Sequence, residues 1–62
     1  MQKWEYLIVS YIARGNYTVN GFEEPALRGK KTYALLNELG EKGWELIYME
    51  KNNEWIFKRP KA

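Results

Sequence analysis

The chain has 62 residues, of which 45% are hydrophobic and 16% aromatic, and it contains no cysteine and no histidine. This composition excludes disulfide bonds and zinc sites of the Cys/His type, and it argues against a disordered chain. The net charge of +2 is too small to indicate a dedicated nucleic-acid binder, and no apolar run approaches the roughly 20 residues of a membrane span.

Residues 4–12 (WEYLIVSYI) predict a strand, because they are mostly β-branched or aromatic and include neither Gly nor Pro. Both faces of this strand are largely apolar, so we expect both to be covered. Residues 13–28 carry turn signals at Gly15-Asn16 and at Asn20-Gly21. Residues 17–19 between them either form a short strand that returns against the first, or belong to a sixteen-residue loop.

Residues 30–39 (KKTYALLNEL) predict the helix, since their apolar side chains recur at the spacing of one helical face. That stripe consists of Thr32, Leu35, Leu36 and Leu39. Gly40 follows it and is expected to be the left-handed C-terminal cap.

Residues 44–51 and 54–59 predict a hairpin around Asn52-Asn53, because Asn tolerates the positive φ of a two-residue type I′ turn. Such a turn places Lys51 opposite Glu54, so that opposite charges meet across the strands. The same register places apolar residues opposite each other, in the pairs Met49–Ile56 and Tyr48–Phe57.

These elements predict a single α+β domain over residues 1–62, with the order strand–helix–strand–strand and a three-stranded, antiparallel-rich sheet. The expected aromatic face of the sheet carries Trp4, Tyr6, Ile8, Trp44, Leu46, Tyr48, Trp55 and Phe57. The other expected face carries Leu7, Val9, Tyr11, Ile47, Met49 and Ile56. One short helix can cover only one face, and we expect it on the aromatic one. The second set is then the predicted interface of a homodimer, which would also stabilise so small a domain.

Three blocks of the sequence stand out by their residues and spacing: Lys3-Trp4-Glu5-Tyr6 at the start, 36–46 (LNELGEKGWEL) in the middle and Ile56-Phe57-Lys58-Arg59-Pro60 at the end. Together they resemble domain-of-unknown-function family 4177. The resemblance implies a short bacterial or phage protein with a compact strand–helix–hairpin domain, and it implies no activity. Position 7 is often charged in such sequences, and Leu7 makes the second face of this chain more apolar.

Catalysis is not expected, because a chain without His, Cys or Asp lacks the usual general bases, thiol nucleophiles and metal-ligand sets. No cofactor is expected either. Residues 28–32 (RGKKT) resemble the end of a phosphate-binding loop, but Glu24 occupies the position where that motif requires Gly. Arg28, Lys30 and Lys31 could still bind an anion at the helix N-terminus, or they could simply be solvated. The tail, residues 58–61, could likewise touch phosphates or fray.

The expected function is non-catalytic binding by a homodimer that inhibits or regulates a partner protein by docking on it. The alternative is a protein that sequesters an anionic small molecule such as a nucleotide, with residues 13–28 as a lid. The first residues contain no apolar signal core, which favours a cytoplasmic location.

Overall fold

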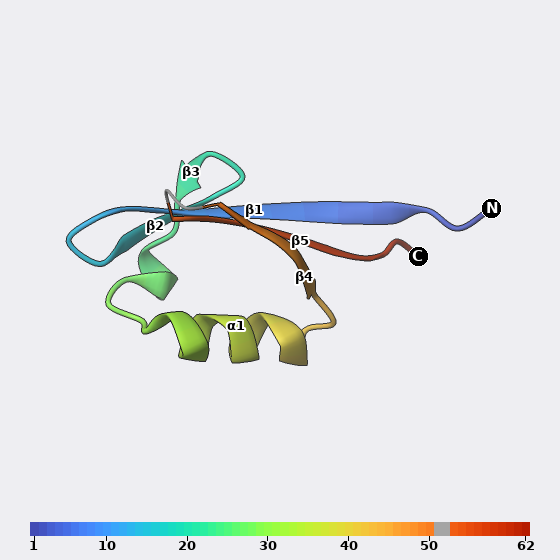
Figure 1. The fold of residues 1–62 in the computed structure, drawn as a ribbon. Helices are drawn as coiled ribbons and strands as arrows, with labels where there is room; N and C mark the ends of the chain where they lie inside the picture. The colour runs from blue at the N-terminus through green and yellow to red at the C-terminus, as the bar shows by residue number, and fades with distance from the viewer. Residues whose placement is uncertain (51–52) are drawn as a thin grey trace.

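The computed structural model describes residues 1–50 and 53–62, and within them five strands form one antiparallel sheet with a single α-helix packed against it (Figure 1). The elements are β1 (Trp4–Ala13), β2 (Asn16–Val19), β3 (Phe22–Glu23), the 3₁₀ turn η1 (Pro25–Leu27), α1 (Thr32–Glu41), β4 (Glu45–Glu50) and β5 (Glu54–Pro60). The strands lie side by side in the order β3-β2-β1-β5-β4. The α+β class is confirmed, but the predicted three-stranded sheet and the predicted strand–helix–strand–strand order are both wrong, because β2 and β3 come before the helix and extend the sheet.

Two tight turns order the segment that the sequence left open. Arg14 and Gly15 have φ values of 54° and 79° between β1 and β2, and Asn20 and Gly21 have 52° and 91° between β2 and β3. Two successive residues with positive φ match the twist of the flanking strands, so each turn folds the chain back antiparallel. Residues 17–19 therefore lie in the short returning strand β2, and the alternative of a sixteen-residue loop is wrong.

The helix begins and ends two residues later than predicted, and Gly40 lies inside it. Gly43 adopts the left-handed conformation expected of Gly40, with φ 88°. The Trp44 backbone N–H donates to the Leu39 carbonyl at 3.0 Å, which closes the helix end and directs the chain into β4. No helix in the described parts of the chain is long and apolar enough to cross a membrane.

The β4–β5 hairpin is confirmed, but its register is one residue away from the prediction. Glu50 pairs with Glu54, and Met49 pairs with Trp55. Asn53 has φ 67°, as expected for an Asn in this turn. The predicted partner of Glu54, Lys51, lies outside the described residues. Since side chains alternate between faces, this shift exchanges the faces predicted for Tyr48 and Met49 relative to β5, whereas beyond the irregularity in β4 Leu46 still shares the face of Phe57, as predicted.

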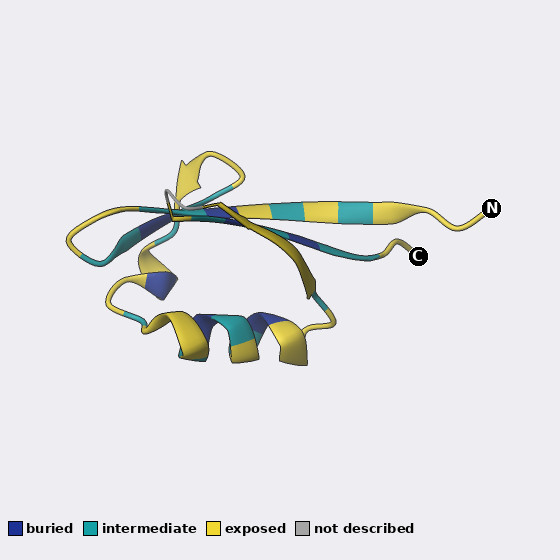
Figure 2. Cartoon of the chain, in the orientation of Figure 1, coloured by how far each residue is buried: buried dark blue, intermediate teal, exposed yellow. Residues whose placement is uncertain are grey.

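The core lies between the sheet and the helical segments, and it combines both predicted faces. Pairing of β1 with β5 sets Leu7 opposite Phe57 and Val9 opposite Trp55, so all four point toward α1. The buried residues are Val9, Tyr17, Leu27, Leu35, Leu39, Trp55 and Phe57. Figure 2 shows these buried positions on α1, η1 and the central strands. The expectation that α1 covers a face containing Trp4, Tyr6 and Ile8 is therefore wrong.

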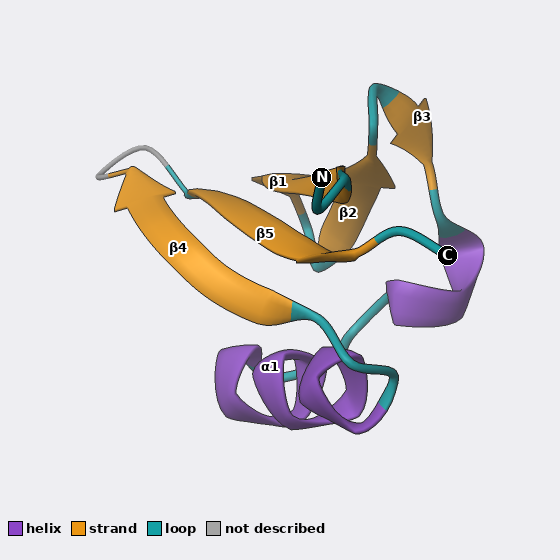
Figure 3. Ribbon diagram, turned by 90° about the vertical axis from the view of Figure 1, so that its right-hand side faces the viewer, coloured by secondary structure: helices purple, strands orange, loops and turns teal. Residues whose placement is uncertain are grey.

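The two edges of the sheet differ in length. β3 has only two residues, whereas β4 has six and curves along the free side of β5 (Figure 3). A register irregularity falls between Leu46 and Tyr48, and a glutamate stands at each end of β4. Bulges and charges at an edge oppose uncontrolled pairing with other chains.

Candidate functional site

The sheet face turned away from α1 remains uncovered, and we call it the open face. The cross-strand register places thirteen side chains on it: Trp4, Tyr6, Ile8, Ser10, Thr18, Glu23, Glu45, Tyr48, Glu50, Glu54, Ile56, Lys58 and Pro60. Figure 1 shows α1 and η1 on the opposite side of the sheet. The open face is therefore a surface that no element of the described chain covers.

Large apolar side chains occupy the middle of the open face. Ile8 pairs with Ile56, and Ile56 pairs with Tyr48, so three strands contribute to one apolar row. Tyr6 and Tyr48 are 57% and 53% exposed. The ammonium group of Lys58 lies 4.3 Å from the ring centroid of Trp4, which gives the cation–π contact of a partly exposed pair.

Polar side chains form a second row, which crosses all five strands beside the apolar row. Its members in strand order are Glu23, Thr18, Ser10, Glu54 and Glu50. The Ser10 hydroxyl donates to Glu54 Oε2 at 3.1 Å. We call this set the polar row. Sequence reasoning missed it, because it exists only once the register of every strand is known.

The predicted dimer interface does not form one surface. Val9 is fully buried, and Leu7 and Tyr11 pack against the same core. Met49 pairs with Trp55 and so lies on the α1 side of the sheet, although it is exposed at the edge. Ile47, also exposed, lies at the irregularity in β4. Only Ile56 belongs to the open face.

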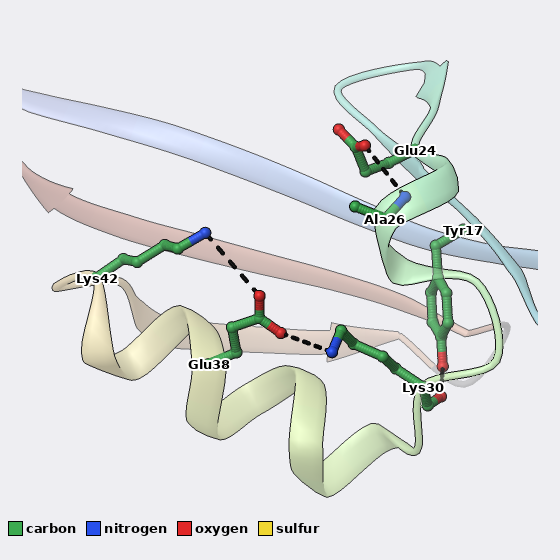
Figure 4. Close-up of polar contacts among 6 residues, drawn as sticks. All are labelled: Tyr17, Glu24, Ala26, Lys30, Glu38 and Lys42. Atoms are coloured by element: carbon green, nitrogen blue, oxygen red, sulfur yellow. Dashed lines mark hydrogen bonds and ion pairs between the residues drawn. The ribbon is translucent and has the colours of Figure 1, made fainter.

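The predicted anion-binding residues lie between η1 and the start of α1, where one of them is already paired. Lys30 Nζ lies 3.1 Å from Glu38 Oε2, and Lys42 Nζ lies 4.0 Å from the other carboxylate oxygen (Figure 4). Arg28 and Lys31 are exposed. Lys31 occupies the N-cap position of α1 and makes no side-chain capping bond. The carboxylate beside Lys30 reduces the positive potential available to an anion there.

A backbone contact brings a fourth positively charged side chain, Arg14, to the segment before α1. The Gly29 N–H donates to the Gly15 carbonyl at 2.8 Å, so the β1–β2 turn lies against the segment before α1. Arg14 precedes Gly15 and is exposed. A Cβ on Gly15 would lie 3.3 Å from the Gly29 nitrogen, so this approach favours glycine. Residues 16–27, part of the segment expected as a lid, contribute two strands and a 3₁₀ turn to the fold.

A small pocket of about 270 Å³ lies between η1, α1 and the sheet. Its apolar lining comes from Leu7, Val19, Ala26, Leu27, Leu39 and Trp44, and its polar lining from Glu24, Glu38 and Lys42. Figure 4 shows these three charged side chains, with Glu24 just before η1, Glu38 on α1 and Lys42 just after α1. Two carboxylates against one ammonium do not suit an anion, and none of Arg28, Lys30 and Lys31 lines the pocket.

Comparisons with known proteins identify a family and nothing beyond it. No curated protein and no solved structure matches the chain. A family model described as a domain of unknown function, DUF4177, matches residues 4–60, which is almost the whole chain. The chain therefore belongs to the DUF4177 family.

Proposed function

We propose that this protein is a non-catalytic binding protein that docks its open face onto another protein and thereby inhibits or regulates it. The observation that carries the proposal is the row of exposed apolar side chains on an uncovered sheet face. Trp and Tyr side chains offer about 150–250 Å² each when fully accessible. The exposed parts of Trp4, Tyr6, Ile8 and Tyr48 then amount to several hundred Å², on the order of the largest patches of monomeric proteins, which are often functional.

Charge on the open face favours a different protein over a second copy as the occupant. Among the described residues, this face carries four carboxylates and one ammonium group, that of Lys58. A face-to-face homodimer would bring two such acidic faces together, and like charges in apposition oppose association. A homodimer through this face is accordingly an outcome that the test must separate from docking.

Photocrosslinking from matched tyrosine positions tests the proposal. A photoreactive phenylalanine analogue at Tyr6 or Tyr48 should form adducts with one partner protein in the cells that naturally express the chain. The matched control is Tyr33 on α1, which is 68% exposed but lies away from the open face. We expect adducts from the two open-face positions at several times the yield from Tyr33. Equal yields from all three positions would contradict docking, and adducts of twice the chain mass would indicate a homodimer.

The second candidate function is binding of an anionic small molecule, such as a nucleotide, at the start of α1. The contact between Gly15 and Gly29 supports it, because it adds Arg14 to the cations Arg28 and Lys31 near free helix N–H groups. Titration with a nucleotide should then shift the backbone amide resonances of residues 29–33, and Lys31→Glu should weaken binding at least tenfold. Lys61→Glu, at the opposite end of the chain, should leave binding unchanged. Shifts confined to other residues would rule this function out.

A further inference from the structure

The polar row and the apolar row together make the open face chemically asymmetric along its strands. Ser10 follows Ile8 by two residues, and Glu54 precedes Ile56 by two, so the two rows are direct neighbours. Two residues of a strand span about 7 Å, and adjacent strands lie about 4.8 Å apart. A bound partner that covers the apolar row therefore also meets the polar row.

One pair in the polar row works against the stability of the free protein. Glu50 and Glu54 are directly opposite each other on β4 and β5, and like charges in this position are destabilising. At the other end of the same two strands, Glu45 is opposite Lys58, which is the favourable arrangement. The sheet thus places repelling carboxylates beside its exposed apolar row, while the chain as a whole carries a net charge of +2.

From this arrangement we infer that the open face binds a protein partner that presents Lys or Arg side chains over the polar row and apolar side chains over the apolar row. The inference rests on the proposed docking function and specifies its partner. A cation between Glu50 and Glu54 relieves their repulsion, so binding gains energy that the free protein lacks. Nucleic-acid phosphates would be repelled by the same carboxylates. Within the described residues, no group of acidic side chains is placed to hold a metal ion instead.

A pair of synthetic helical peptides provides the probe. Both carry the same leucine stripe, bordered by lysines in one peptide and by glutamates in the other. Because the protein is net positive, non-specific attraction would favour the acidic peptide. We expect the lysine peptide to bind at least tenfold more tightly, with its affinity falling as salt is added, and to shift the amide resonances of Ile8 and Ile56. Equal affinities, or no binding of either peptide at millimolar concentration, would overturn the inference.

Substitutions separate the charge inference from the docking proposal on which it rests. Glu50→Gln combined with Glu54→Gln keeps side-chain size and an acceptor for Ser10, and it should weaken the lysine peptide at least tenfold. Glu41→Gln on α1 removes the same kind of charge elsewhere and should have no effect. Ile8→Ser should weaken both peptides. An effect of Ile8→Ser without an effect of the double substitution would retain docking and refute the basic partner.

The stability of the free protein should change in the opposite direction from its affinity for the lysine peptide. Glu50→Gln should raise the urea midpoint of unfolding, because it removes the repulsion with Glu54, while it weakens binding of the lysine peptide. Glu41→Gln is again the control, with little change expected in either quantity. A lower midpoint for Glu50→Gln would show that this carboxylate stabilises the fold. It would contradict the inference that the carboxylate contributes favourable energy only when a partner is bound.

Discussion

Phe57→Ala should remove a large part of the protein's free energy of unfolding at 25 °C. Phe57 is 1% exposed and lies at the centre of the core between β1 and β4, opposite Leu7 on one side and Leu46 on the other. Replacing a buried Phe by Ala costs about 3–5 kcal/mol, because burial is lost and a cavity remains. A domain of this length has a total free energy of unfolding of about 3–9 kcal/mol. Urea titration followed by circular dichroism measures the loss.

The matched control is an aromatic residue on the neighbouring strand that points the other way. Tyr6 belongs to the open face, and Tyr6→Ala should cost less than about 1 kcal/mol in the same titration. Phe57→Leu retains most of the buried volume and should cost less than about 1.5 kcal/mol, so that a folded core variant can be compared. A larger loss for Tyr6→Ala than for Phe57→Ala would mean that the two faces of the sheet are assigned the wrong way round.

The sequence predicts the identity of the long elements well, because each depends on a local pattern. The first strand, the helix and the final hairpin all form where β-branched runs and the leucine spacing indicate them. β3 was missed because a two-residue strand, Phe22–Glu23, carries no period of its own. Gly43 takes the capping conformation expected of Gly40, since both glycines follow the leucine stripe and the leucine spacing does not distinguish them; in the structure, the bond from the Trp44 N–H to the Leu39 carbonyl closes the helix beyond Gly43.

The open face could not be assigned from local patterns, since it depends on the register between strands far apart in the sequence. β1 carries apolar side chains on both faces, so alternation alone leaves open which residues of β5 share the face of Leu7. The sequence does contain one signal of the register between β1 and β5, which is the pairing of opposite charges. Glu5 lies opposite Arg59, and that pair alone sets Leu7 against Phe57. It would have placed Phe57 in the core and left Tyr6 exposed.

Arg59 was predicted both as the last residue of the final strand and as part of a tail that touches phosphates or frays. It lies within β5, where its Nε donates to Glu5 Oε2 at 2.7 Å. One terminal nitrogen donates to the Lys42 carbonyl at 2.8 Å, and the guanidinium lies 4.2 Å from the ring centroid of Trp44. One side chain thus ties β5 to β1 and to the segment between α1 and β4.

Arg59→Ala should lower the free energy of unfolding by about 1–2 kcal/mol. The ion pair is about a third exposed and contributes little alone, so the carbonyl bond and the stacking on Trp44 account for much of the loss. Arg59→Lys should recover less than half of it, because a lysine ammonium lacks the planar fork that serves three partners at once. Lys61→Ala, two residues further along, should leave the urea midpoint unchanged. If lysine restored full stability, charge alone would be sufficient, and the three-way contact of Arg59 would not be what holds the end of β5 against the helix.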